Sequence, residues 1–374
     1  MEEKAFNLDF YAPTFLIKIG GKAQEELKNA VISLDVDENL ESASMFTINI
    51  NEGLDIKTQK FTWLDNKLLD PTEGKDVEIY MGYASRAKEL KEPLITGIIT
   101  ALNPSFPSTG IPTLSVQGYD HSFCLQKSVV KKKRTFDEEK DYEAIAKKIA
   151  AEHNLGVGDI DHTIEPCKKI TQNPGESDYK FLKRLADRLG YEFFIMDKKL
   201  YFRKPRDNEK KKKVITLGWG KELISFNPRL STAKVVSKVT VKGHNQKNPK
   251  KPIIGVATLK DIGFKEPKAK SAAESVKTCQ KKEVETSEHD FPVCNEEDAK
   301  ALAEALLMKA NNSVIEGSCE CIGIPELRPG TNVLINGIGK RFSGKYYIKS
   351  VKHSIGGSGY TVSFEVRRGG IGTI

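Results

Sequence analysis

Short segments in which apolar and polar residues alternate follow one another through residues 1–125. They read TFLIKI, VISLDVDEN, SMFTINI, KDVEIYMGY and TLSVQGYD, with Gly, Asn, Asp or Pro between them. Successive side chains of a strand point to opposite faces, so each segment predicts a strand with one buried face. Strands spaced by roughly ten residues, with turn residues between them, predict a β-barrel or sandwich.

The end of the chain repeats the order of these strands. Residues 74–82 read GKDVEIYMG, and residues 330–337 read GTNVLING. Each is followed by a strand that opens with a small residue and Gly, TGIITAL from Thr96 and SGKYYIKSV from Ser343, and then by a last alternating strand. Because order and spacing agree over three consecutive elements, the sequence predicts two related β-barrels.

The apolar period changes between the two sets of strands. DYEAIAKKIAAEHNL predicts an amphipathic helix capped by Asp141, and DYKFLKRLADRL predicts a second, beginning at Ser177 and Asp178 and ending at Gly190. YEFFIM and LYF, on either side of DKK, predict a hairpin. Helices and hairpin can bury one another, so residues 126–205 are expected to be a packing module of α+β type.

The fold class expected is therefore mainly β with an α+β insert: two similar antiparallel β-barrels flank a helix–hairpin module. The first barrel is assigned to residues 1–125. Residues 206–294 are expected to hold a strand pair, LISFNPRL with AKVVSKVTVKGHN, and a weakly patterned, Lys-rich excursion from about Gln246 to Glu288. Residues 295–374 are assigned to a helix capped by Asn295 and to the rest of the second barrel. The role of the Lys-rich residues 247–282 stays open.

Composition narrows the classes of function. The formal net charge is +8, from 59 basic and 51 acidic side chains, a mild excess for 374 residues. The Lys runs from Lys131, Lys210 and Lys281 lack interleaved aromatic residues, so solvated links are favoured over a specific nucleic-acid site. The acidic start does not resemble a signal peptide, and no segment reaches the ~20 apolar residues of a spanning helix. We expect synthesis in a cytosol and no membrane insertion.

No pattern of residues predicts catalysis. GxSxG, HExxH and DxDxDG motifs are absent, and GIGK at Gly337 lacks the spacing of a phosphate loop. The neighbours Asp120 and His121 would face opposite ways on a strand. The cysteines form no CxxC pair, Cys319 and Cys321 are expected to be buried thiols, and Cys279, His289 and Cys294 fit no common zinc spacing. We therefore predict no catalytic, cofactor-binding or metal-binding residues, no cofactor, and a protein that is not an enzyme.

The central segment NPGESDYKFLKRLADRLGYEFFIMDKKLYFRKP resembles the hallmark segment of the phage late-control protein D family. The matching residues are Gln172, Glu176, Ser177, Asp178, Tyr179, Phe181, Leu182, Arg184, Leu185, Ala186 and Gly190. The C-terminal segment is similar to the family's second barrel. There the matching residues are Pro329, Gly330, Gly344, Tyr346, Ile348, Val351, His353, Thr361 and Phe364.

The resemblance implies a baseplate hub of a contractile phage tail or phage-tail-like injection system. The family's architecture is a homotrimer in which two barrels per chain give six similar units, which would adapt a threefold central spike to a sixfold, hexameric tail tube. The spike is expected to be a separate polypeptide, and other baseplate subunits are further expected partners. Such a protein would be assembled in the bacterial cytoplasm and become part of a virion tail or an extracellular particle.

Two alternatives stay open at this point. One is a tail-tip enzyme that degrades peptidoglycan; the other is a stand-alone β-barrel protein that binds a polyanion or glycan. The sequence does not distinguish a phage from a bacteriocin or an injection system, and it names neither cargo nor neighbouring subunits.

Overall fold

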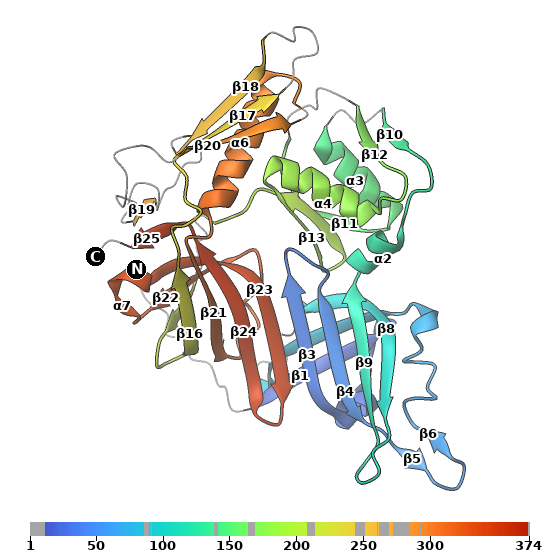
Figure 1. The fold of residues 1–374 in the computed structure, drawn as a ribbon. Coiled ribbons are helices and arrows are strands. Elements are labelled where there is room, and N and C mark those ends of the chain that lie inside the picture. The colour runs from blue at the N-terminus through green and yellow to red at the C-terminus, as the bar shows by residue number, and fades with distance from the viewer. Residues whose placement is uncertain are drawn as a thin grey trace.

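The computed structural model describes residues 12–85, 90, 92–137, 141–163, 169–207, 214–243, 251–259, 261, 269–271, 285–291 and 293–372. The protein is mainly β, as predicted. Its main feature is a 13-stranded, largely antiparallel sheet in which the N-terminal and C-terminal strands lie side by side (Figure 1).

The N-terminal half of this sheet has the strand order β1-β7-β8-β9-β4-β3. The helix α1 (Glu25–Ala30) lies between β1 and β3 in the chain, and its Leu27 is buried in the core. The strands are β1 (Pro13–Ile19), β3 (Val31–Asn39), β4 (Met45–Asn51), β7 (Asp76–Tyr83), β8 (Ile95–Ser105) and β9 (Thr113–Asp120), with β2 (Lys22–Ala23) beside β1 and a separate pair β5 (Leu54–Asp55) and β6 (Lys60–Phe61). A 3-10 turn η1 (Pro71–Glu73) precedes β7.

The C-terminal half has the strand order β15-β22-β23-β24-β21-β16. Its strands are β15 (Ile215–Gly218), β16 (Leu223–Leu230), β21 (Ile315–Ile322), β22 (Asn332–Asn336), β23 (Gly344–Gly356) and β24 (Gly359–Arg368). A four-residue helix, α7 (Gly339–Phe342), follows β22, and β25 (Gly370–Gly372) pairs with β19 (Ala269–Ser271).

The two halves share strand order and irregularities of register. The ladder of β8 with β9 shifts between Ile99 and Ala101, and that of β23 with β24 shifts between Ile348 and Ser350. A second shift recurs between β3 and β4, at Val31 to Ser33, and between β16 and β21, at Leu223 to Ser225. Two bulges at equivalent places are much stronger evidence of duplication than alternation alone, because a bulge is a specific local feature. One difference remains: β1 pairs antiparallel with β7, whereas β15 pairs parallel with β22.

The register corrects one detail of the sequence comparison. The sequence echo sets Gly97 against Gly344, but Val77 lies opposite Gly97 while the equivalent Val333 lies opposite Tyr346. The two glycines therefore hold different places. A Cβ at Gly97 would lie 2.2 Å from the carbonyl oxygen of Tyr119, so that glycine permits a close approach of two strands.

The halves are joined edge to edge rather than standing apart as two closed barrels. β23 pairs with β22 through its first residues and with β3 through Ser350–Ile355. One hydrophobic core, which includes Phe46, Ile48, Tyr346 and Val362, extends under both halves. The two similar antiparallel β-barrels expected from the sequence thus correspond to two halves of one sheet, each with six equivalent strands and β2 in addition at β1, fused through the β3–β23 ladder.

The α+β insert forms its own core. It contains α2 (Ser122–Lys127), β10 (Arg134–Phe136), α3 (Tyr142–Glu152), β11 (Gly156–Ile160), β12 (Ile170–Gln172), α4 (Asp178–Leu189), β13 (Glu192–Met196) and β14 (Lys199–Arg203). Side chains of both long helices and of the hairpin meet there, among them Ile145, Phe181, Phe193 and Phe202. The predicted caps are present: Asp141 and Ser177 accept hydrogen bonds from Ala144 N and Lys180 N.

The segment after β16 differs from the prediction. β16 and β17 (Lys238–Gly243) do not pair with each other. β17 forms a three-stranded sheet with β18 (Ile253–Thr258) and β20 (Glu285–Phe291). The helix α6 (Glu296–Asn311), expected in the second barrel, packs on this sheet, and Val239, Val241 and Leu302 share its core. Part of the expected excursion is therefore folded, while most of residues 247–282 lie outside the described residues.

Candidate assembly surface

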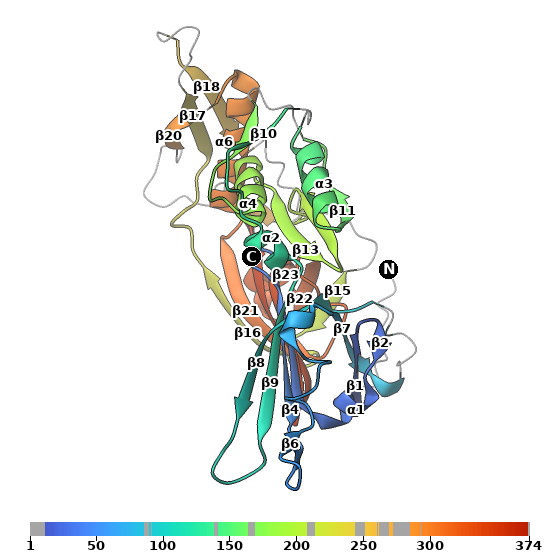
Figure 2. The same ribbon diagram turned by 90° about the vertical axis from the view of Figure 1, so that its right-hand side faces the viewer.

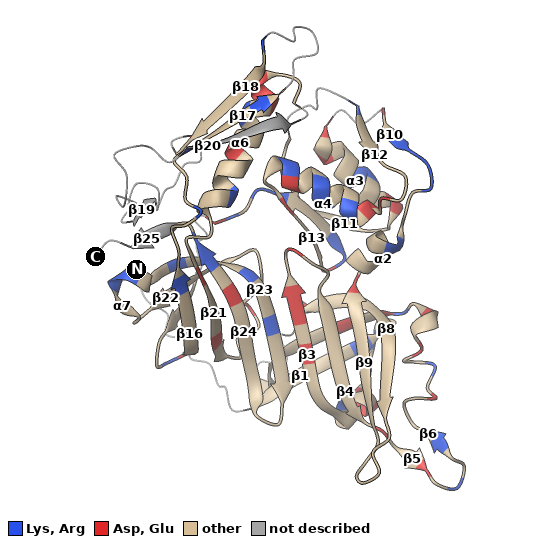
Figure 3. Ribbon diagram, in the orientation of Figure 1, with Lys and Arg blue, Asp and Glu red and all other residues tan. Residues whose placement is uncertain are grey.

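One face of the large sheet is polar across both halves. Since antiparallel partners point to the same face, the ladders define rows of side chains that cross the strands. One row runs from β24 to β8 and consists of Thr361, Ser354, Asp35, Thr47, Gln117 and Ala101. None of these residues is buried, whereas neighbours along β3, β4 and β9, such as Val36, Ile48 and Val116, are. Figure 3 shows charged residues on β3, β23 and β24. The face is suited to solvent or to a polar partner.

Among the strand edges without a ladder partner in the described ranges, those of β8 and β16 correspond to the two edges that meet inside the chain. β7 pairs with β8 only through Ile95–Ile98, which leaves that side of Ala101–Ser105 without a ladder partner. β16 pairs with β21 on one side, and its other side makes only the isolated bridge of Trp219 with Leu223. Figure 2 shows the lower ends of β8 and β9 projecting as a two-stranded ribbon, away from the insert. Unpaired edges invite pairing with another chain, so natural proteins usually cover or block them.

A buried ion pair ties the two halves together where β3 meets β23. Arg328 donates to Glu38 Oε1 at 2.8 Å, and to the carbonyl oxygens of Pro93 at 3.2 Å and Leu94 at 2.9 Å. Asp197, in the β13–β14 turn, lies 3.8 Å from the same guanidinium. Burial raises the pKa of Glu38 to about 7, although Arg328 opposes the shift. One arginine thus connects both halves and the insert.

His353, which the resemblance selected, lies in the same place. It is fully buried; Nδ1 lies 2.8 Å from Tyr360 Oη and Nε2 lies 3.0 Å from the carbonyl oxygen of Leu327. Burial, together with Arg328 nearby, lowers the pKa of His353 to about 3. The ring is therefore neutral: Nε2–H donates to Leu327 and Nδ1 accepts from Tyr360. This histidine holds the fold and has no free nitrogen for acid–base chemistry.

The polar residues of the central motif also have structural roles. Asp178 is buried at 2% exposure and accepts from Ser128 Oγ at 2.5 Å and Gln172 Nε2 at 2.9 Å, with His153 Nε2 at 2.8 Å. Burial alone would raise its pKa, but the hydrogen bonds from Ser128, His153 and Gln172 outweigh burial and lower it. The carboxylate therefore anchors the start of α4 to three neighbouring segments of the insert.

Two further motif residues act in the same way. Glu176 accepts two hydrogen bonds from Arg184, at 2.8 and 3.0 Å, and one from Asn173 N. Tyr179 donates to the carbonyl oxygen of Glu41, which links the insert to the N-terminal half. The motif thus fixes the shape and seating of the insert.

Gly190 ends α4 in the left-handed region, at φ 68°, and a Cβ there would lie 2.9 Å from Ala305 Cβ. This glycine allows α4 to approach α6. The neighbouring Arg188, also on α4, donates two hydrogen bonds of 2.9 Å to the carboxylate of Asp298 on α6.

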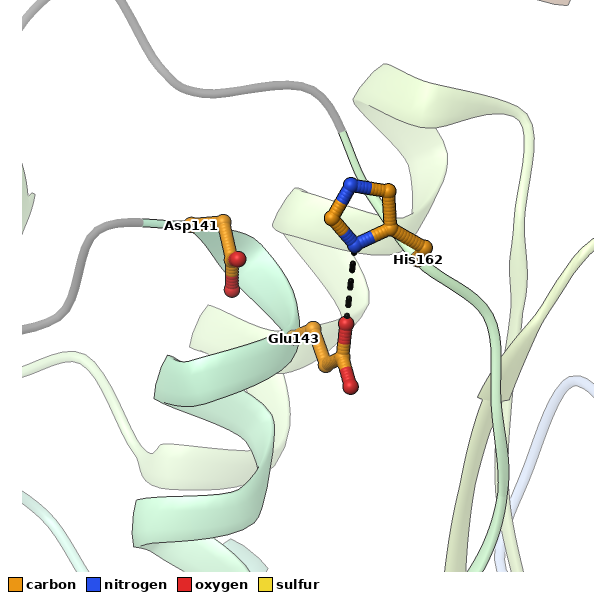
Figure 4. A group of neighbouring side chains, drawn as sticks. All are labelled: Asp141, Glu143 and His162. Atoms are coloured by element: carbon orange, nitrogen blue, oxygen red, sulfur yellow. Dashed lines mark hydrogen bonds and ion pairs between the residues drawn. The ribbon is translucent and has the colours of Figure 1, made fainter.

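One group of side chains in the described part of the chain has the proximity of metal ligands (Figure 4). Asp141, Glu143 and His162 bring one ligand atom each within 4.8 Å of one another. Asp141 already caps α3, and Glu143 accepts from Lys147 and lies 3.2 Å from His162 Nδ1. Since His162 is 86% exposed and each acid has a partner, helix capping and surface pairing account for the group.

The other candidates from the sequence lie apart. Asp120 accepts from Ser44 N and from Ser122, whereas His121 faces Asp76 at 3.2 Å. Cys319 and Cys321 are buried free thiols, as predicted. Cys294 is disulfide-bonded, so its sulfur is not available as a zinc ligand. Cys279 lies outside the described residues. No helix in the described ranges is both long and apolar enough to cross a membrane.

Sequence comparison identifies a family over nearly the whole chain. Residues 11–357 match the family described as the Alg8 N-terminal domain. The chain belongs to the Alg8 N-terminal domain family. No curated protein sequence matches it significantly.

The fold of this Alg8 N-terminal domain protein is also found in solved tail proteins. A 43 kDa tail protein of prophage MuSo2 from Shewanella oneidensis is similar with TM-score 0.67 and 17% identity, over 96% of this chain and 98% of that one. A tail protein from Neisseria meningitidis MC58 gives 0.67 and 15%, over 96% and 97%. An E. coli component of the type VI secretion system gives 0.58 and 14%, over 94% and 76%. At these identities the likeness shows a phage-tail protein fold.

Proposed function

We propose that the chain is a structural, non-catalytic baseplate hub of a contractile phage tail or phage-tail-like injection system. Three copies would form a ring that joins a threefold spike, supplied by a separate polypeptide, to the sixfold, hexameric tail tube. Other baseplate subunits would surround it. The mature protein would therefore be part of a virion tail or an extracellular particle.

The duplicated sheet is the observation that carries this proposal. Two halves with the same strand order and the same two bulges are joined side by side through β3 and β23. If three such chains surround one axis, six similar units surround it as well, which suits a protein between threefold and sixfold partners. The polar face that crosses both halves would then line the ring as one continuous surface.

Two likenesses support the same role. The central motif resembles that of the late-control protein D family, and the structure assigns its polar residues to the shape of the insert. Solved structures with this fold are described as tail proteins and as a component of the type VI secretion system. Membership of the Alg8 N-terminal domain family is compatible with this proposal.

The mass of the native assembly tests the proposal. Light scattering of the purified chain, alone and with its spike protein, should give three chain masses in at least one of the two samples. Electron microscopy of the complex with the tube should place the chain on the central axis. A monomer under both conditions, or a position away from the axis, would exclude the hub.

The non-catalytic role has its own test. Glu176 and Asp178 are the acids that a tail-tip hydrolase would most plausibly use in this segment, and both are held by structural hydrogen bonds. We expect no lysis on a peptidoglycan zymogram. Lysis by the wild type that is lost in Glu176→Gln, a variant with the same shape, would favour the enzyme.

A further inference from the structure

The ladder between β23 and β3 within one chain indicates how the edges of β8 and β16 can pair between copies. β23 and β3 pair through Ser350–Ile355 and Asn39–Leu34. The shared bulges make Ala101 of β8 equivalent to Ser350 of β23, and Ser33 of β3 equivalent to Ser225 of β16. The two equivalent edges, on β8 and β16, have no ladder partner over these residues. β8 belongs to the N-terminal half and β16 is the last strand of the C-terminal half, so in the proposed ring these edges would meet between copies.

Transferring the internal register aligns the two edges residue by residue. Inside the chain Ser350 lies opposite Asn39, so the equivalent residues Ala101 and Ser231 would lie opposite each other between copies. In the same way, the internal pair of Lys352 and Asp37 corresponds to a pair of Asn103 and Arg229 between copies. In the internal ladder Leu40 N donates to the carbonyl oxygen of Lys349 at 3.3 Å. Because hydrogen-bonded and non-hydrogen-bonded pairs alternate, Lys352 and Asp37 form a non-hydrogen-bonded pair. Asn103 and Arg229 are therefore expected to form a non-hydrogen-bonded pair as well.

The side chains on these edges fit such a junction. In the aligned register the face that continues the core contains only apolar residues: Leu102, Pro104 and Phe106 from β8 and its extension, and Phe226, Pro228 and Leu230 from β16. Phe106 is 57% exposed in the single chain and the three β16 residues are half-buried. The opposite face contains small or polar residues, as it does at the internal junction. Burying the apolar row provides the driving force for association.

Two prolines limit the length of the ladder. Pro104 and Pro228 correspond to His353 and Val36, which form a hydrogen-bonded pair within the chain. A proline has no N–H to donate, so the ladder between copies ends there. The same prolines protect both edges from indiscriminate pairing before assembly.

We infer that β8 of one copy and β16 of the next copy pair antiparallel, Ala101–Asn103 with Arg229–Ser231, and that Phe106 and Phe226 pack together beyond the prolines. The partner is a second copy of this chain, and the inference rests on the proposed ring. It adds which edges meet, in which register, and why this junction is shorter than the internal one.

Engineered disulfides test the register in the full-length chain. Opposite residues of a non-hydrogen-bonded antiparallel pair have Cα atoms about 4.5 Å apart, within the range of a disulfide. Asn103→Cys combined with Arg229→Cys should therefore give bands of two and three chain masses after oxidation on a non-reducing gel, and reductant should remove them. Ser105→Cys with Arg229→Cys shifts the register by two residues and should yield about tenfold less cross-linked protein.

Two controls make the result interpretable. Lys352→Cys with Asp37→Cys should close within one chain and add no mass, since these residues already lie opposite each other. The wild type should form no ladder, because its free thiols among the described residues are buried or half-buried. If a trimer forms but the matched pair cross-links no better than the shifted pair, the inference is wrong and the hub proposal stands. If no trimer forms at all, both fail.

A charge on the apolar row gives an independent test. Phe106→Glu should weaken trimer formation about tenfold or more, because the carboxylate would be buried between copies. Within the single chain the Phe106 ring is 57% exposed and lies 5.3 Å from the ring of Phe61, centroid to centroid, so the melting temperature should fall by no more than the loss of this one surface contact. Ile254→Glu, at an exposed apolar residue of β18, is the matched control and should leave assembly unchanged. Normal assembly of Phe106→Glu would overturn the packing of Phe106 against the next copy.

Discussion

Replacing Arg328 with methionine should destabilise the protein by about 2–6 kcal/mol at neutral pH, about 1–3 kcal/mol for each of two carbonyls. The variant leaves the carbonyl oxygens of Pro93 and Leu94 without their donor, and an unsatisfied buried acceptor costs about 1–3 kcal/mol. Losing the charge partner of Glu38 adds little at pH 7, because the pKa of Glu38 is already about 7 and the carboxyl can take up a proton. The magnitude thus comes mainly from the two carbonyls.

The pH dependence separates the two contributions. The pKa of Glu38 in the folded protein is raised above its value of 4.5 in an unfolded chain, so its favourable contribution is complete below 4.5 and is lost as pH rises towards 7. Removing Arg328 raises the pKa of Glu38 in the folded protein further. In the variant, the contribution of Glu38 to stability therefore continues to fall above pH 7. The penalty of the variant should then grow by up to about 1.4 kcal/mol per pH unit. Glu38→Gln in the same chain should abolish this growth.

Urea unfolding at about pH 6, 7 and 8.5 measures these effects through the fluorescence of buried Trp63, in a Trp219→Phe background. Lys300→Met breaks an exposed ion pair to Asp261 and is the control, with an expected change within about 0.5 kcal/mol at every pH. A penalty for Arg328→Met below about 1 kcal/mol, or one that is equal at pH 6 and 8.5, would refute the reasoning.

Two further substitutions test the insert. Asp178→Ala leaves the donors around Asp178 unpaired and should lower the free energy of unfolding by about 2–4 kcal/mol at pH 7, measured by urea unfolding. Because hydrogen bonds lower the pKa of Asp178, this cost should shrink as pH falls through that pKa. An unchanged cost at acid pH would contradict the assignment. Gly190→Ala should lower stability by more than the ~1 kcal/mol of left-handed strain, because the new Cβ meets Ala305. Gly20→Ala, with φ 58° and nothing within 4 Å of its Cβ, should show the strain alone; equal costs for the two glycines would refute the contact with α6.

The two long helices and the hairpin of the insert could be predicted from sequence, whereas α2, β10, β11 and β12 were not predicted. Ser177 caps α4 and Gly190 ends it, as expected, because both effects act within one turn of the chain. The repeat indicated that the two sets of strands are related, but it did not give their order in the large sheet. The role of Asp178 could not, since its partners Ser128, His153 and Gln172 come from three separate segments.

Two predictions failed because pairing is not a local property. Alternation identified both β16 and β17 as strands but could not show that they belong to different sheets. The helix α6 has an apolar stripe that suits any sheet, and only the folded chain places it on β17 and β18. Weak patterning around β18 and β20 concealed a small unit whose parallel pair joins residues far apart in the sequence.

The sequence alone determined that this chain is mainly β, where the long helices α3, α4 and α6 begin, and that its two sets of strands are related, because periodicity and capping depend on neighbouring residues. Only the tertiary structure decided that β23 pairs with β3, that Arg328 meets Glu38 across that junction, and that β8 and β16 retain open edges. Those facts depend on strand edges hundreds of residues apart, where burial of a shared core, rather than local preference, selects the partner.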